Sequence, residues 1–98
     1  MANKKHDEKR NVVDKCLKLI KIYGGKAFKT DGNYKPDIIG CVLGKMVVIE
    51  CKDKGLLCDL TEGQQIELRA WQKAGAVAMA IDDPNDLAKI LEDASKWK

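Results

Sequence analysis

The sequence predicts an α/β fold in which a mixed central sheet is flanked by helices, with the elements in the order α-β-β-β-α-β-α. Apolar residues recur at helical spacing in three segments, and four short apolar, strand-like segments lie between those helices. The helix expected over 62–74 connects the third strand to the fourth. A crossover of this kind joins parallel strands, so we expect those two strands to be parallel and the sheet to be mixed.

The first helix is expected to begin at Glu8, after a polar, flexible tail over residues 1–7. It should end at Gly24-Gly25, because glycine adopts the left-handed conformation that commonly caps a helix. The apolar positions at helical spacing are Val12, Val13, Cys16, Leu17, Leu19, Ile20 and Tyr23. A short strand over 26–29 follows, and the turn-forming residues 30–36 predict a loop.

Two apolar segments between Asp37 and Lys52 predict a β-hairpin. The break at Gly44-Lys45 is a plausible tight turn, which would pair Leu43 with Met46. This register places Asp37 opposite Lys52.

Three charged side chains interrupt the apolar hairpin, namely Asp37, Glu50 and Lys52. In the predicted register they share one face, and the two carboxylates are diagonal neighbours about 7–8 Å apart. A solvent-facing ion pair is the plain alternative. Residues 46–49 are apolar on both faces, however, as in a buried central strand. A buried carboxylate pair without a partner cation costs several kcal/mol or becomes neutral, so a metal ion is the simplest explanation. Oxygen ligands favour Mg²⁺ or Mn²⁺ over zinc.

The second half of the chain begins with a loop over 53–60. Thr61 and Gln64 have the spacing of a capping box, which predicts a helix from Thr61 through Trp71 to a cap at Gly75. A buried strand is expected over 76–81.

The final helix is predicted to begin with Asp83 as its N-cap and Pro84 in its first turn. Its buried face should comprise Leu87, Ile90, Leu91, Ala94 and Trp97.

Composition indicates one globular domain spanning residues 1–98, since 34% of the residues are charged and 45% are hydrophobic. The net charge of +3 permits binding to a polyanion without demanding it. No apolar run approaches the ~20 residues of a membrane span, and the polar start is no signal peptide. We therefore expect an intracellular protein that does not bind membranes.

The four cysteines are Cys16, Cys41, Cys51 and Cys58, and none belongs to a Cys-x-x-Cys pair. The single histidine, His6, lies in the expected tail. Three of the cysteines sit inside apolar segments, where cysteine behaves as a small hydrophobe. We expect reduced, structural thiols rather than a zinc site.

Pro36-Asp37 before the hairpin turn and Glu50-Cys51-Lys52 after it, in this order of elements, resemble the PD-(D/E)XK nuclease superfamily. Within it, the chain is most similar to the small VRR-NUC (virus-type replication-repair nuclease) domains, and the resemblance covers roughly residues 8–82. Further matching residues are Lys29, Pro36–Gly40, Leu60–Gln65 and Lys73-Ala74-Gly75. The chain departs from the family at Lys35, usually a small residue, and at Cys51, commonly Val. The resemblance implies a restriction-endonuclease-like core.

The resemblance also implies roles at the site. Asp37 and Glu50 would ligate Mg²⁺ or Mn²⁺ together with the main-chain carbonyl of Cys51. Lys52 would orient the attacking water and help to deprotonate it. Glu8 is a further candidate metal ligand, and the alternative is a solvated glutamate favoured by the helix dipole.

Gln64 would lie near the metal or the scissile phosphate, with Gln65 as the alternative. Three lysines, Lys29, Lys35 and Lys54, flank the site in sequence and could hold the DNA backbone. Ordinary solvated surface lysines are the alternative for each.

The sequence therefore predicts a Mg²⁺- or Mn²⁺-dependent DNA endonuclease, specific for branched DNA such as a Holliday junction, in the cytoplasm of a bacterial or phage-infected cell. Cutting two opposing strands requires two sites, so a homodimer is expected, with Leu56 and Leu57 as interface candidates. One alternative is a nuclease-like fold that only binds DNA or a protein partner. Another is a plain α/β domain with a surface ion pair.

Overall fold

The chain forms the predicted sequence of elements, with one short 3₁₀ helix added in the loop after the third strand. The computed structural model describes residues 4–30 and 36–95, with side chains over 9–30 and 36–94. The elements are α1 (Lys4–Ile22), β1 (Lys26–Lys29), β2 (Ile38–Val42), β3 (Lys45–Cys51), the 3₁₀ helix (Leu57–Asp59), α2 (Glu62–Lys73), β4 (Val77–Ile81) and α3 (Pro84–Ser95).

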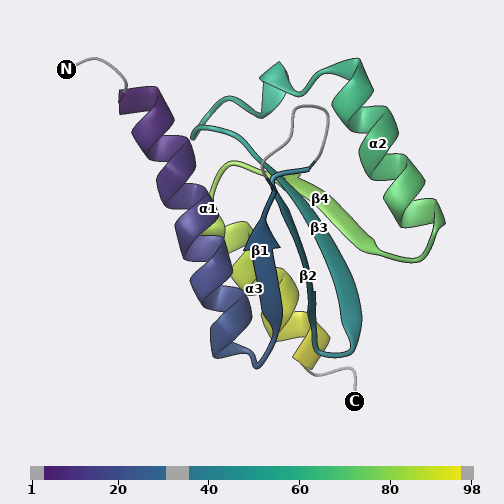
Figure 1. The fold of residues 1–98 in the computed structure, drawn as a ribbon. Coiled ribbons are helices and arrows are strands. Elements are labelled where there is room, and N and C mark those ends of the chain that lie inside the picture. Colours follow the sequence, from purple (N-terminus) through teal and green to yellow (C-terminus); the bar gives the residue numbers. More distant parts are fainter. Residues whose placement is uncertain (1–3, 31–35, 96–98) are drawn as a thin grey trace.

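The four strands form one mixed sheet in the order β1-β2-β3-β4. Strand β2 is antiparallel to both β1 and β3, whereas β3 and β4 are parallel, as the crossover through α2 predicts. Helices α1 and α3 cover one face of the sheet, and α2 lies on the other (Figure 1).

The core is divided between the two faces of the sheet. The larger cluster lies under α1 and α3, and its buried members are Val12, Val13, Cys16, Ile20, Ile38, Val42, Val47, Ile49, Cys51, Ile81, Leu87 and Leu91. The smaller cluster, under α2, comprises Val48, Leu68 and Ala78. Strand β3 contributes to both clusters, which confirms that its segment is a buried central strand.

Side-chain caps begin α2 and α3 where the sequence predicts them. The Thr61 hydroxyl accepts a hydrogen bond from the Gln64 amide at 3.1 Å, and the Gln64 side chain accepts one from the Thr61 amide at 2.9 Å. The Asp83 carboxylate accepts from the backbone amide of Asn85 at 2.9 Å. Both caps satisfy donors that a helix start would otherwise leave unpaired.

The buried face of α3 is confirmed for Leu87 and Leu91, while Ile90 and Ala94 are half-buried. Trp97 lies outside the described residues.

Helix α1 begins at Lys4 and not at Glu8. The prediction of a flexible tail is therefore wrong for residues 4–7, which are helical. No glycine or proline stands before Glu8 to interrupt the helix, and Lys residues favour helix. The helix ends as predicted, because Gly24 adopts a left-handed φ of 84° and the amide of Gly25 donates to the carbonyl of Ile20 at 2.8 Å.

The hairpin turn is one residue earlier than predicted. Val42 pairs with Lys45, so Leu43 and Gly44 form the two-residue loop, with φ values of 54° and 75°. Positive φ at both positions is typical of a type I′ turn, whose second position strongly favours glycine. The predicted register is therefore wrong by two residues. Because side chains alternate with a period of two, every residue stays on its predicted face.

Close approach of β1 and β2 requires glycine at position 40. Gly40 pairs with Ala27, and a Cβ there would lie 2.5 Å from the Lys26 carbonyl and collide with Ala27. We expect Gly40→Ala to lower the free energy of unfolding by about 1–3 kcal/mol, as overpacking does. Urea denaturation followed by circular dichroism measures it.

Gly63→Ala is the matched control, because a Cβ in the first turn of α2 meets only the Thr61 hydroxyl at 3.9 Å. That variant should be neutral or gain up to about 1 kcal/mol from helix propensity. Equal effects of the two substitutions would contradict the close packing of β1 on β2.

Candidate metal and phosphodiester site

The two carboxylates predicted to form a site lie together at the carboxyl end of β3. Ile38 pairs with Ile49, and continuing this register by one residue places Asp37 directly opposite Glu50 instead of diagonally. Among the described residues, Glu50 is the one charged side chain that is buried, with 4% of its surface exposed. Lys52 lies two residues further along, on the same face of the strand, and is half-buried.

Each carboxylate is fixed by a hydrogen bond. The backbone amide of Cys51 donates to Asp37 Oδ2 at 2.7 Å. The side-chain amide of Gln64 donates to Glu50 Oε2 at 3.1 Å. Gln65, the alternative to Gln64 in the sequence, instead donates to the carbonyl of Leu60 at 3.3 Å. The structure thus brings Gln64, and not Gln65, to the carboxylates.

The capping box of α2 positions Gln64 for this contact. Its side-chain oxygen is held by the amide of Thr61, which leaves the side-chain nitrogen to face Glu50. The same residue therefore begins the helix and orients the buried carboxylate.

Lys9 of α1 is a site residue that the sequence analysis missed. Its ammonium lies 3.4 Å from Asp37 Oδ1. A signal for it was present, since Lys9, Val13, Cys16 and Ile20 recur at spacings of four, three and four, which is one face of a helix. A lysine on the same helix face as buried apolar residues places its aliphatic stem along the core, and its ammonium then favours an acidic partner at the edge of the core.

Burial and charge both act on Glu50. Desolvation, followed by the negative charge of Asp37, raises the pKa of Glu50 from 4.5 to about 7, although Lys9 and Lys52 act in the opposite direction. The charged form of Glu50 is therefore disfavoured in the metal-free site.

Asp37 and Glu50 could hold a divalent cation, because their oxygens converge and each carboxylate is already oriented. The amide of Cys51 points to Asp37, and the N–H and C=O of one strand residue point to the same side, so the Cys51 carbonyl faces this site too. No group of three His, Cys, Asp or Glu side chains converges among the residues whose placement is described. The remaining ligands would be water, which Mg²⁺ commonly retains. The side chain of Glu8 lies outside the described part of the chain.

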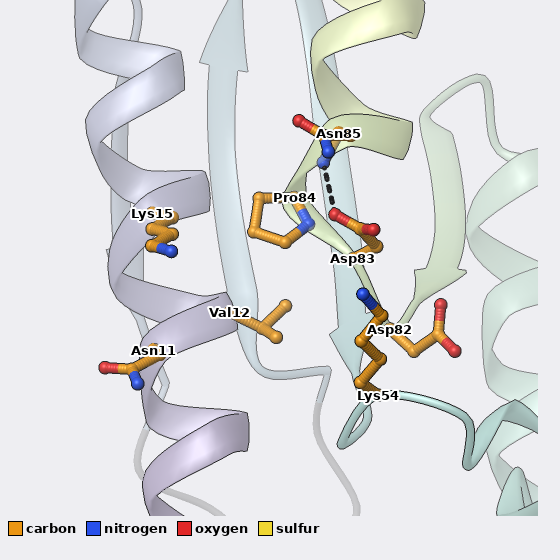
Figure 2. A pocket seen from close by; sticks show the side chains of 8 residues that line it. All are labelled: Asn11, Val12, Lys15, Lys54, Asp82, Asp83, Pro84 and Asn85. Atoms are coloured by element: carbon orange, nitrogen blue, oxygen red, sulfur yellow. Dashed lines mark hydrogen bonds between the residues drawn. The ribbon is translucent and has the colours of Figure 1, made fainter.

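The candidate DNA-binding lysines lie in different places. Lys29 borders a groove on the α2 face of the sheet. Lys54 instead lines a hollow of about 330 Å³ between α1 and the start of α3, beside Lys15, Asp82 and Asn85 (Figure 2). Lys35 lies outside the described residues. Within the part of the chain described, Lys29 is thus the candidate lysine that borders this groove, although its strand partner Ile38 faces the cluster under α1 and α3.

The cysteines are free thiols in two environments. Cys16 and Cys51 are buried, and a hydrogen bond with Cys16, together with burial, raises the pKa of the Cys51 thiol. Reduced, buried thiols are therefore confirmed at these two positions. Cys41 and Cys58 are exposed, so Cys41 does not act as a core residue although it lies in the apolar strand β2.

No protein-family model and no curated protein matches the sequence. A solved structure titled "VRR_NUC domain" superposes with a TM-score of 0.69, covers 87% of this chain and 95% of its own, and is 19% identical in sequence. This chain has the fold of a VRR_NUC domain. The predicted fold class is confirmed, and so is the resemblance at the level of the fold. Within the described residues, no helix has the length and apolarity to cross a membrane.

The raised pKa of Glu50 predicts a pH-dependent stability. Because the folded-state pKa of about 7 exceeds the ordinary 4.5, ionisation of Glu50 destabilises the metal-free fold as pH rises from about 4.5 to 7. We expect Glu50→Gln to be more stable than wild type at pH 8 in EDTA, by on the order of 1–3 kcal/mol, and nearly equal to it at pH 5. Urea denaturation at both pH values measures this.

Asp14→Asn on the exposed side of α1 is the control, and its stability difference from wild type should not change between the two pH values. A Glu50→Gln difference that is independent of pH would show that Glu50 titrates normally.

Proposed function

We propose that this chain is a divalent-metal-dependent endonuclease that hydrolyses phosphodiester bonds of DNA. The observation that carries the proposal is the buried Glu50 carboxylate opposite Asp37, with Lys52 on the same face, in the fold of a VRR_NUC domain. A buried pair of carboxylates costs stability unless a cation offsets it, so a function that binds a cation accounts for their presence.

Asp37 and Glu50 would hold Mg²⁺ or Mn²⁺, with the main-chain carbonyl of Cys51 as a further ligand. Once bound, such a cation neutralises charge on the phosphate and lowers the pKa of a coordinated water. The hydrogen bonds from Cys51 and Gln64 keep the two carboxylates in place without reorganisation.

Lys52 supplies the charge that acts on the substrate. Its ammonium is close enough to lower the pKa of Glu50, yet Lys52 directly follows β3, is half-buried and can face solvent. From there it would orient the attacking water and stabilise the negative oxygens of the phosphate in the transition state. Lys29 would hold the DNA backbone nearby, Lys54 would hold a more distant phosphate, and Lys35 is a further candidate for a phosphate contact.

A module that binds DNA or protein without cleaving is the second candidate. The ion pair between Lys9 and Asp37 favours it, because a lysine can take the place of a metal ion in neutralising a carboxylate. The two candidates differ in whether a divalent cation binds.

Two substitutions should distinguish a loss of metal binding from a loss of catalysis alone. We expect Asp37→Ala to abolish both Mn²⁺ binding and DNA cleavage, because it removes a ligand. Lys52→Ala should retain Mn²⁺ binding but lose cleavage by roughly 100-fold or more, since its ammonium acts on water and phosphate. Isothermal titration with Mn²⁺ and a cleavage assay on junction, flap, single-stranded and duplex DNA measure the two effects.

Lys89→Ala, an exposed lysine on α3, serves as the charge-matched control and should leave both quantities unchanged. Cleavage by Asp37→Ala at the wild-type rate would exclude this active site. Wild-type protein that binds DNA but no Mn²⁺ would favour the binding module.

We further propose that the chain acts as a homodimer on branched DNA, because two sites related by a two-fold axis suit a four-way junction. Leu57 is 39% exposed and Leu56 is half-buried, so the loop before α2 offers apolar surface to a second copy. We expect light scattering at micromolar concentration to give a dimer, and Leu57→Lys to give a monomer. A wild-type monomer that nicks only one strand of a junction would end this part of the proposal.

A further inference from the structure

Helix α2 covers only half of its face of the sheet. It packs against β3 and β4, and the corresponding face of β1 and β2 lacks such a cover among the described elements (Figure 1). Phe28 of β1 lies on this open half, with 62% of its surface exposed. An aromatic side chain with this much exposed surface contributes little apolar burial to the core.

Phe28 lines a groove of about 570 Å³ that runs between the open half of the sheet and α2. Ile39 of β2 forms the floor beside it, and Trp71 of α2 borders the groove from the helix. A volume of this size is within the range of small-molecule sites, and Phe28, Ile39 and Trp71 give the groove aromatic and aliphatic surface.

Two charged residues complete the groove. Glu67 accepts a hydrogen bond from the indole N–H of Trp71 at 3.0 Å, which orients the ring. Its carboxylate also disfavours a phosphate inside the groove, while it can accept hydrogen bonds from a base. Lys29, which also lines the groove, can hold a phosphate at its edge. The groove therefore suits a flat, neutral, aromatic group attached to an anionic backbone.

The groove is continuous with the carboxylate site. Ile39 lies two residues after Asp37, on the same face of the sheet, which corresponds to about 7 Å along a strand. Pro36, the residue before Asp37, lines the groove as well. A strand whose phosphate lies at Asp37 would thus have a base within reach of Phe28.

We propose that this groove binds an unpaired nucleobase of the strand being cut, next to the scissile phosphate. The inference rests on the proposed nuclease function and names its substrate class. Bases in an intact duplex are stacked and paired, so they reach such a groove only when unpaired or extruded. Stacking on aromatic side chains is tolerant of sequence, since every base has a π face. The chain would select DNA with unpaired bases at the cut.

The test compares two single strands of equal length and charge, one an oligothymidylate and the other abasic. Binding is followed by indole fluorescence in the Trp97→Phe background, which leaves Trp71 as the reporter, with Ca²⁺ present. Phe28→Ser removes the exposed ring at little cost to folding, because most of its surface is already in water. Ile22→Ser is the control, since Ile22 is 76% exposed at the end of α1 and lies outside the groove.

We expect the oligothymidylate to quench Trp71 and to bind about 5- to 100-fold more tightly than the abasic strand. Phe28→Ser should remove that preference and leave binding of the abasic strand unchanged, while Ile22→Ser should keep the preference. In Mn²⁺, Phe28→Ser should also lose cleavage of strands with unpaired bases more than cleavage of abasic ones.

Equal binding of both strands by a wild-type protein that cleaves DNA would overturn this inference and leave the proposed function standing. A base preference in a protein that does not cleave DNA would overturn the proposed function and leave the groove only as a site for an unpaired base. If Phe28→Ser instead converts a dimer into a monomer in light scattering and leaves the base preference intact, the groove belongs to a second copy of the chain, and the inference is wrong.

Discussion

The buried carboxylate of Glu50 is the constraint around which the site is organised. It lies in the central strand, where water cannot solvate its charge, and Asp37 directly opposite adds a second negative charge. The surrounding groups partly offset this cost. Gln64 donates a hydrogen bond to Glu50, and the ammonium groups of Lys9 and Lys52 lower the pKa of Glu50, which burial raises. They do not remove the cost completely, since the pKa remains about 7. Under the proposed function, a bound cation would offset this remaining cost.

The position of β3 explains how one strand supports both a core and a site. Ile49 and Cys51 point to the large cluster under α1 and α3, and Val48 points to the small cluster under α2. Glu50 lies on the same side as Val48, at the carboxyl end of β3. There it lies beyond the apolar cluster under α2 and accepts the hydrogen bond from Gln64. The strand is therefore fixed by apolar contacts on both faces, which allows one charged residue at its end without loss of the fold.

The fold and the main site residues were predictable because they depend on periodicity. The face shared by Asp37, Glu50 and Lys52 survived a register error of two residues, since a shift of two leaves each side chain on its face. The capping box placed Gln64 at a helix start, and the contact with Glu50 followed from it. Turn position was less predictable: Leu43 adopts a positive φ that its residue type disfavours, because Gly44 then takes the second position of the turn.

Contacts between elements that are distant in the chain could not be predicted from one sequence. The ion pair of Lys9 with Asp37 depends on how α1 crosses the sheet, and the open face beside Phe28 depends on where α2 stops covering it. Both are set by packing and have no local signature in the sequence apart from the helical phase of Lys9. The separation of the lysines has the same origin. Lys29 ends β1 beside the groove under α2, whereas the loop after β3 carries Lys54 to the hollow between α1 and α3.

Helix α2 links the two halves of the proposed substrate site. Gln64, Leu68 and Trp71 are spaced four and three residues apart, so they form one stripe that faces the sheet. Gln64 contacts the buried carboxylate, Leu68 is buried in the core under the helix, and Trp71 borders the groove, about 10 Å along the axis from Gln64. Because Leu68 fixes the rotation of the helix, the amide at the carboxylates and the indole at the groove are positioned by the same apolar contact. A substitution that rotates α2 would therefore disturb both ends together, whereas Phe28, on the opposite wall, affects the groove alone.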